Sequence, residues 1–261
     1  MISECLLRHF FTAFIMNVST KEGCADMNAV DVLAELEALG TERTKKSYLA
    51  SGAREPLFGT ATGKMKPILK KTGLNQTLAD ELYDTKNYDA MYFAGMIAEP
   101  NNMTAADYER WMDGAYFNML ADYVVAVTLA EADIAEEVAD RWIHSEDALR
   151  MSAGWSCYCW MLGNRKDETF DAAKISVLLD LAKETIHEAP NQARSAMNNF
   201  IKTVGISYKP LHEKALAVAK EVGSVELKRD GKKSTFLEPL SAIEKEVEKG
   251  RIGFKRKHVR C

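Results

Sequence analysis

A helical pattern of apolar residues runs almost without a break from Met27 onward, and it leaves few choices of fold. Leu33, Leu36 and Leu39 recur at the spacing that places side chains on one face of an α-helix. Evidence for strands is slight, because no turn residues bracket the β-prone run at 123–129. The sequence therefore predicts an all-α protein, with a charged loop or short hairpin from Leu227 to Ser234.

The predicted helices come in pairs, in which a polar amphipathic helix precedes a more apolar one. The apolar members centre near Met91, Asp122, Trp155 and Met197. These separations are roughly the size of HEAT-type helical-hairpin repeats. Stacked hairpins form a solenoid whose second helices line one concave surface, and we expect this repeat domain to span residues 28–248.

Few polar groups fall on the second helices, and two of them stand alone in apolar surroundings. Asp122 is the only charge in residues 115–130, and Arg150 is the only charge in residues 148–163. A helix that is apolar on most faces lies inside a protein, where an unpaired carboxylate is costly. We expect Asp122 to be ion-paired, protonated or open to a ligand cleft.

Two alternatives follow for these polar groups. Asp89, Asp122, Arg150 and Arg194 could lie along the concave surface and contact a ligand. Alternatively, Asp122 could form a buried structural ion pair with Arg150 or Arg194.

Composition and cysteine usage limit the function classes only loosely. The chain has 261 residues, of which 47% are hydrophobic, so it can bury a substantial core. A net charge of −4 does not indicate nucleic-acid binding, and it does not exclude it, since a local basic face is what binds phosphates. Cys157 and Cys159 point to different faces of a helix, so we expect reduced thiols in a cytoplasmic protein, without metal or cofactor.

Residues 1–27 contain a short apolar run that Arg8 and His9 interrupt. The run is too short for a membrane span and lacks the features of a signal peptide. We expect residues 1–27 to be a poorly ordered extension and the protein to have no membrane association.

Two segments, residues 63–71 and the C-terminal tail 249–261, carry several basic side chains and no acid. Segments of this kind contact phosphates, or else they are solvated faces with no ligand. The basic residues that we single out are Lys64, Lys66, Lys70, Lys255, Arg256 and Lys257.

The order of several short motifs resembles the DNA alkylation repair (AlkD-type) family, over about Leu33 to Val222. The motifs are LFG at Leu57–Gly59, FNMLADYVV, SEDALRMSAGW, HEAPNQARSAMN and the basic ending IGFKRKHVRC. The resemblance implies a right-handed superhelical solenoid of HEAT-like hairpins. It also implies that duplex DNA, alkylated or distorted, binds the concave face, and we expect the protein to be a monomer.

The family resemblance further implies hydrolytic excision of cationic purines such as 3-methyladenine and 7-methylguanine. Asp122 matches the catalytic aspartate of the family, where an anion stabilises the oxocarbenium-like state of the sugar. Arg150 falls at or next to the phosphate-binding arginine of the family. Arg194 and Asn198, on one later helix, could reach the DNA backbone or base edges, or they could satisfy polar groups in the core.

The sequence differs from the glycosylases of the family at two aromatic positions. Those enzymes place tryptophans just before the catalytic acid and on a later helix, where this chain has Asn118 or Met119 and a position near Asn198. The alternative functions are therefore a non-catalytic protein that binds damaged or branched DNA, and a helical-repeat scaffold for protein partners.

Overall fold

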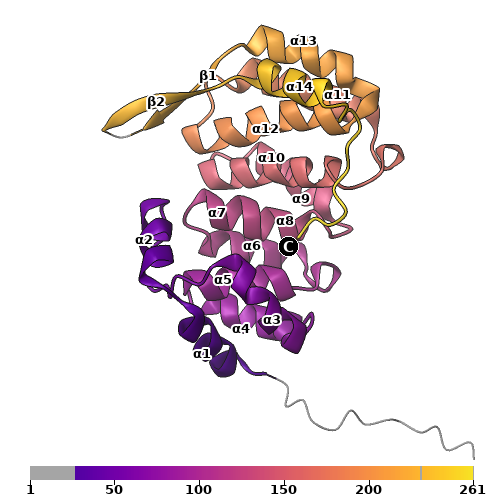
Figure 1. Cartoon of the computed structure of the whole chain (residues 1–261). Helices are drawn as coiled ribbons and strands as arrows, with labels where there is room; N and C mark the ends of the chain where they lie inside the picture. The colour runs from indigo at the N-terminus through magenta and orange to yellow at the C-terminus, as the bar shows by residue number, and fades with distance from the viewer. Residues whose placement is uncertain (1–26, 230, 261) are drawn as a thin grey trace, which may run out of the picture.

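The computed structural model describes residues 27–229 and 231–260, which form a stack of helices (Figure 1). The described helices come largely in consecutive hairpins, each with an outer and an inner member. The hairpins are α4 (Gln76–Asp84) with α5 (Tyr88–Ile97), α6 (Ala105–Gly114) with the continuous helix α7 (Asn118–Leu120), η2 (Ala121–Val125) and α8 (Ala126–Leu129), α9 (Ala135–Ile143) with α10 (Ala148–Leu162), and α11 (Ala172–Thr185) with α12 (Asn191–Ser207).

The remaining elements close the two ends of the stack and join its hairpins. They are α1 (Ala29–Leu39), α2 (Glu42–Ala50), α3 (Thr62–Thr72), α13 (His212–Val222), α14 (Pro239–Glu248) and the short 3-10 turns η1 (Pro100–Asn102), η3 (Asp167–Thr169) and η4 (Lys209–Leu211). The predicted extension lies mostly outside the described residues, which begin at Met27.

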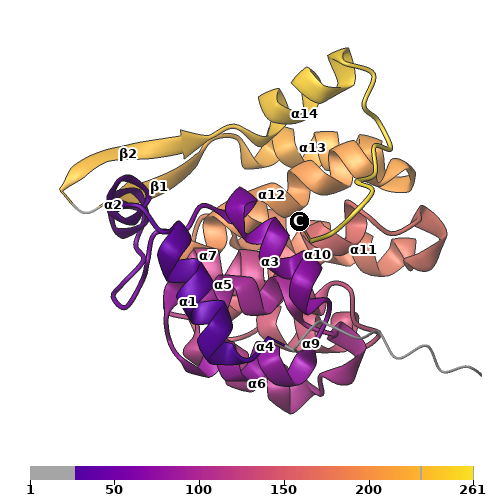
Figure 2. The same cartoon turned by 60° about the horizontal axis from the view of Figure 1, so that its bottom comes forward.

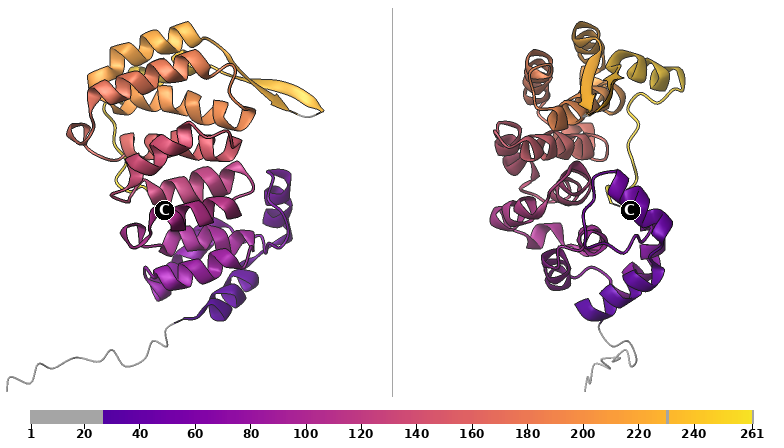
Figure 3. Two further views of the ribbon diagram at one scale, coloured as in Figure 1. Left: turned by 180° about the vertical axis from the view of Figure 1, so that it is seen from behind. Right: turned by 90° about the vertical axis from the view of Figure 1, so that its left-hand side faces the viewer.

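The predicted pairing of helices is confirmed. Met91, Asp122, Trp155 and Met197 lie on α5, η2, α10 and α12, the inner members of successive hairpins. These inner helices pack directly on one another, while the outer helices stack behind them (Figure 3). The result is a HEAT-like solenoid, as the sequence predicted.

The prediction of an all-α chain misses one element, although the hairpin alternative for Leu227–Ser234 was correct. Strands β1 (Val225–Arg229) and β2 (Lys232–Leu237) pair antiparallel between α13 and α14, with Val225 opposite Leu237. This hairpin projects from the stack on the same side as α2 (Figures 1 and 2). The hairpin and α2 therefore lie on one side of the solenoid, with the hairpin toward its C-terminal end and α2 beside its middle (Figure 1).

Close packing and capping fix the hairpins in place. A Cβ on Gly154 would lie 2.7 Å from the backbone nitrogen of Ile143, so α10 approaches α9 more closely than an alanine would allow. The Asp147 side chain accepts a hydrogen bond from the Arg150 backbone N–H and caps α10. A capping box of Thr104 and Asp107 starts α6 in the same way.

The C-terminal tail, residues 249–260, packs along the solenoid from α14 toward α5 and α8 (Figure 1). The backbone N–H of Arg256 donates to the carbonyl of Gly163 at 2.8 Å. Farther on, the Arg260 guanidinium donates to the carbonyls of Gly95 and Ala98, each at 2.8 Å, and pairs with Glu131. The tail thus joins helices that lie far apart in the sequence.

Candidate nucleic-acid interface

Asp122 lies in the π-helical turn η2, which interrupts the α-helix between α7 and α8. The backbone carbonyl of Asp122 accepts a hydrogen bond from the Trp160 indole at 2.9 Å. Widened turns of this kind re-aim side chains and are common at functional sites. Here the turn directs the Asp122 carboxylate toward α10 and α12.

Neutral donors hold the Asp122 carboxylate. The Asn118 amide donates to it at 2.9 Å, and the Ser152 hydroxyl lies 2.9 and 3.0 Å from its two oxygens. Ser152 also lies 3.2 Å from the Gln192 carbonyl at the start of α12. One polar cluster therefore joins three inner helices around a carboxyl group that is 8% exposed.

Burial raises the pKa of Asp122 from 3.8 to about 6. Hydrogen bonds from Asn118, Ser152 and Ser156 favour the ionised form and partly offset this effect. At neutral pH the carboxylate is mostly ionised, yet no ion pair of Asp122 occurs within the described residues. The predicted ion pair with Arg150 or Arg194 is therefore wrong, because three neutral side chains satisfy the acid instead.

Arg150 is held by carboxylates of its own. Its guanidinium donates to Glu109 at 3.2 Å and to Asp113, and Asp147 lies 4.0 Å away. These three acids compensate the arginine charge, so the site attracts a phosphate weakly. The expectation of Arg150 as a free phosphate ligand is corrected accordingly.

Arg194 and Asn198 on α12 both serve the packing of the protein. The Arg194 guanidinium donates to the carbonyls of Ala189 at 2.8 Å and Glu226 at 3.0 Å, so it fastens β1 to α12. Asn198 is 3% exposed and lies in the core. The Asn198 Oδ1 has no hydrogen-bond partner among the described residues, so the core-satisfying alternative holds for Arg194 alone. The DNA contacts of the two residues stay predictions.

Asp89, expected along the inner surface, is fully buried in α5. Its carboxylate accepts the backbone N–H groups of Phe58, Gly59 and Thr60 at 2.6, 3.0 and 2.8 Å. Asp89 therefore orders the loop between α2 and α3 and is not available to a ligand.

The predicted basic residues separate into exposed and engaged groups. Lys64, Lys66 and Lys70 are exposed on α3, and none of them lines a cleft near Asp122. Their contact with phosphates stays a prediction.

The tail residues differ from one another. Lys255 donates to the Leu162 carbonyl and pairs with Asp167, both at 2.7 Å, so the expected phosphate contact of Lys255 is corrected to a structural ion pair. Arg256 lies over the Trp160 ring, 4.7 Å from its centroid, and Lys257 is exposed. The tail thus packs against the body of the protein through Lys255 and Arg256, and the phosphate contacts of Arg256 and Lys257 stay predictions.

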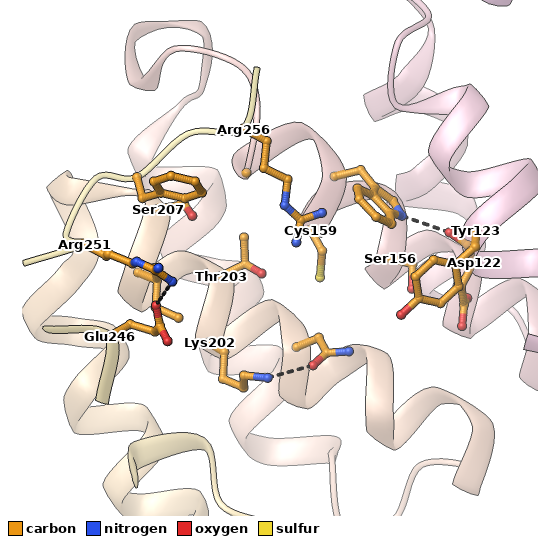
Figure 4. A pocket seen from close by; sticks show the side chains of 15 residues that line it. Asp122, Tyr123, Ser156, Cys159, Lys202, Thr203, Ser207, Glu246, Arg251 and Arg256 are labelled. Atoms are coloured by element: carbon orange, nitrogen blue, oxygen red, sulfur yellow. Dashed lines mark hydrogen bonds and ion pairs between the residues drawn. The ribbon is translucent and has the colours of Figure 1, made fainter. Parts of the chain in front are cut away.

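Two clefts, each of about 430 Å³, meet at Asp122. The first, which we call the tail cleft, lies between α10, α12, α14 and the tail (Figure 4). The second, the hairpin cleft, opens beside Asn118, Asn191, Gln192 and Leu227. The two clefts therefore share a boundary formed by Asp122, Tyr123, Ser156 and Asn199.

Basic residues flank the side of the solenoid on which the hairpin cleft opens. Arg43 and Lys46 are exposed on α2, and Lys228 and Lys233 are exposed on the hairpin. Within the described part of the chain these four side chains form no ion pair. The sequence showed them as basic residues, but no spacing signal placed α2 and the hairpin on the same side.

Within the described residues, no helix is both long and apolar enough to span a membrane. The same residues contain no group of three or more His, Cys, Asp or Glu side chains arranged to hold a metal ion. Cys157 and Cys159 are free thiols.

Comparisons with known proteins place these features in context. Residues 32–234 match the family described as DNA alkylation repair enzyme. An uncharacterised protein of Listeria innocua is 32% identical over 217 residues, which cover 81% of this chain and 93% of that protein. An uncharacterised protein of Listeria monocytogenes is 31% identical over 217 residues, with the same coverage of both chains.

A solved structure is more similar still. It shares 64% sequence identity with this chain and superposes with a TM-score of 0.88, covering 90% of this chain and 100% of that one. It is described as a new family of proteins related to the HEAT-like repeat DNA glycosylases with affinity for branched DNA structures.

Proposed function

Because the chain belongs to the DNA alkylation repair enzyme family, we propose that it is a DNA-binding protein that recognises branched or distorted duplexes without excising bases. The observation that carries this proposal is that hydrogen bonds within the protein hold the carboxylate of Asp122. The residue that would act on a lesion is tied by Asn118 and Ser152 into a structural cluster. The DNA-binding part of the proposal rests on the basic side chains that flank this cluster.

The flanking elements are suited to two separate DNA segments. The exposed cations Arg43 and Lys46 belong to α2, and Lys228 and Lys233 belong to the hairpin. These two elements lie on the same side of the solenoid, α2 beside the middle of the stack and the hairpin toward its C-terminal end (Figure 1). Helices α7 and α12 also begin beside the hairpin cleft, and a helix N-terminus attracts anions. Phosphates of two arms of a junction can therefore be bound by two separate elements on one side of the protein.

The surroundings of Asp122 argue against base excision. An N-glycosylase must hold the deoxyribose of the lesion against the catalytic anion, and aromatic rings do this in the glycosylases that the sequence resembles. Asn118 stands four residues before Asp122, with its amide bonded to the carboxylate, and Asn198 is buried in the core. The affinity of the structural relative for branched DNA structures supports branched DNA as the ligand in this proposal.

A second candidate function is excision of 3-methyladenine or 7-methylguanine with Asp122 as the catalytic anion. The observation in its favour is that Asp122 borders both clefts and is mostly ionised at neutral pH. A positively charged purine needs no general acid to leave, so an anion alone could lower the barrier.

One experiment separates the two candidates. Wild type and Asp122→Asn are incubated with a methylated linear duplex and with a methylated four-way junction, and binding and released bases are both measured. We expect binding of the junction and no release of methylated purine above the protein-free rate. Release by wild type that Asp122→Asn abolishes would establish excision, whereas absence of binding to every DNA would reject both candidates.

A further inference from the structure

The tail cleft has a lining that the packing of the solenoid does not require. It has a volume of about 430 Å³, within the roughly 300–1,000 Å³ range of small-ligand sites. Asp122 and Tyr123 lie at one end, and the ion pair of Arg251 and Glu246 lies at the other (Figure 4). The tail cleft thus has polar groups at both ends and lies between α10, α12, α14 and the tail.

Two cations face this space from opposite walls. Lys202 extends from α12, and Arg256 extends from the tail above it (Figure 4). Lys202 donates only to the neutral Asn199 amide oxygen at 3.1 Å, and Arg256 lies over the Trp160 ring. Neither forms an ion pair with any residue that the structure describes, whereas Arg251 in the same cleft is neutralised by Glu246. Lys202 and Arg256 are therefore two cations in the tail cleft that no described acid neutralises.

An exposed aromatic ring adjoins these cations. Tyr123 is 46% exposed although it lies on an inner helix. Its ring packs edge-on against Trp160, with 5.7 Å between the ring centroids. An exposed aromatic ring that lines a cleft can stack on a base, and stacking on one aromatic ring is worth roughly 1–3 kcal/mol per base.

Hydroxyl and amide side chains complete the lining of the tail cleft. Ser156, Thr203 and the Asn199 amide also line the tail cleft. Hydroxyl and amide groups can donate to or accept from the edge of a nucleobase. One cleft thus contains cations that can bind a phosphate, an aromatic ring that can stack on a base, and polar groups that can bond the edge of the base. A nucleotide has all three of the matching groups.

We propose that the tail cleft binds a single unpaired nucleotide, with its base against Tyr123 and its phosphate between Lys202 and Arg256. This inference rests on the proposed function, because the nucleotide is taken to be an unpaired one at a branch point or flap of bound DNA. The basic elements supply a general affinity for DNA. The tail cleft adds a preference for junctions that carry an unpaired nucleotide.

The test uses full-length protein and two junctions of identical sequence, one fully paired and one with a single unpaired 2-aminopurine nucleotide at the branch point. Affinity is measured by fluorescence anisotropy with a distant dye, and stacking is measured by quenching of 2-aminopurine. We expect wild type to bind the junction with the unpaired nucleotide about tenfold more tightly, since one stacked base and one phosphate contact are gained. We also expect its 2-aminopurine emission to fall on binding.

Three variants assign the effect to the cleft. Lys202→Ala and Tyr123→Ala are each expected to remove most of the tenfold preference and to leave binding of the fully paired junction within about twofold. Lys202→Arg is expected to keep the tenfold preference, because arginine keeps the positive charge. Lys220→Ala, which removes an exposed lysine of α13, serves as the matched control and is expected to bind both junctions as wild type does.

The outcomes separate this inference from the proposed function. Equal affinity of wild type for the two junctions, or an unchanged preference in Lys202→Ala and Tyr123→Ala, would overturn the nucleotide site while leaving junction binding intact. Failure to bind either junction would reject the proposed function itself.

A titration with a free deoxynucleoside monophosphate is a separate experiment on the tail cleft. Saturable binding that Lys202→Ala weakens, without preference between the junctions, would assign the cleft to a free nucleotide and overturn the proposal for DNA.

Discussion

The buried carboxylate of Asp122 makes a prediction about stability that needs no DNA. Its pKa is raised from 3.8 to about 6, mainly by burial. Between these values the folded protein holds a proton that the unfolded chain releases, so the free energy of unfolding falls as the pH rises from about 4 to about 6. A shift of about two pKa units corresponds to roughly 3 kcal/mol.

Asp122→Asn removes this titration and keeps the shape of the side chain. We therefore expect the stability of the variant relative to wild type to rise by about 3 kcal/mol between pH 4 and pH 7. For a chain of this size the melting-temperature difference between the two proteins would change by roughly 6–12 °C over that range. The loss of hydrogen bonds from Asn118 and Ser152 shifts the variant by an amount that does not depend on pH in this way.

The assay is thermal unfolding by circular dichroism at several pH values between 4 and 7.5, at constant ionic strength. Asp133→Asn replaces an exposed carboxylate and is the matched control, for which we expect a difference from wild type that changes little with pH. All other titrating groups are common to the compared proteins and cancel. A melting-temperature difference for Asp122→Asn that stays constant across the range would refute the reasoning.

Three further predictions concern other parts of the molecule. Arg260→Ala removes a guanidinium that bonds two backbone carbonyls and Glu131, so we expect a loss of about 2 kcal/mol in urea unfolding; an unchanged midpoint would show that the tail adds no stability. Gly154→Ala places a Cβ 2.7 Å from the Ile143 nitrogen, and overpacking of this kind should cost about 1–3 kcal/mol in the same assay; wild-type stability would contradict that close approach. The double variant Lys228→Ala, Lys233→Ala should weaken binding to branched DNA and reduce the slope of log affinity against log salt by about 2, and an unchanged slope would place the hairpin away from phosphates.

The repeat architecture could be predicted from the sequence because it depends on local patterns. The apolar inner helices centred near Met91, Asp122, Trp155 and Met197 were each found one hairpin apart. Helical periodicity and the length of a hairpin can both be recognised within short windows of residues. The β1–β2 hairpin was left open between loop and hairpin because its residues lack a strong apolar alternation.

The partners of the charged residues could not be predicted, because they depend on contacts between distant segments. The sequence marked Asp122 and Arg150 as unusual, but it could not show that Asp122 is bonded to Asn118 and Ser152 while Arg150 is paired with Glu109 and Asp113. Both of these acids lie on the outer helix α6, and sequence patterns do not show which inner helix its side chains reach.

The course of the tail was also beyond local reasoning. A basic segment without acids suggests a solvated arm, yet Lys255 and Arg260 each find an acid on a distant segment. The tail cleft exists only because Arg256 is carried over Trp160 by this packing. The long sequence separation of these contacts is the physical reason that they leave no pattern in the chain.

The ratio of affinities for a four-way junction and for a linear duplex of equal length is the most direct measure of recognition of branched DNA. Both would be titrated by anisotropy at physiological salt, where non-specific phosphate contacts are weakened. Simultaneous contacts of α2 and the hairpin with two arms predict that the junction binds at least about tenfold more tightly. Equal affinities for the two DNAs would contradict recognition of branched structures by this protein.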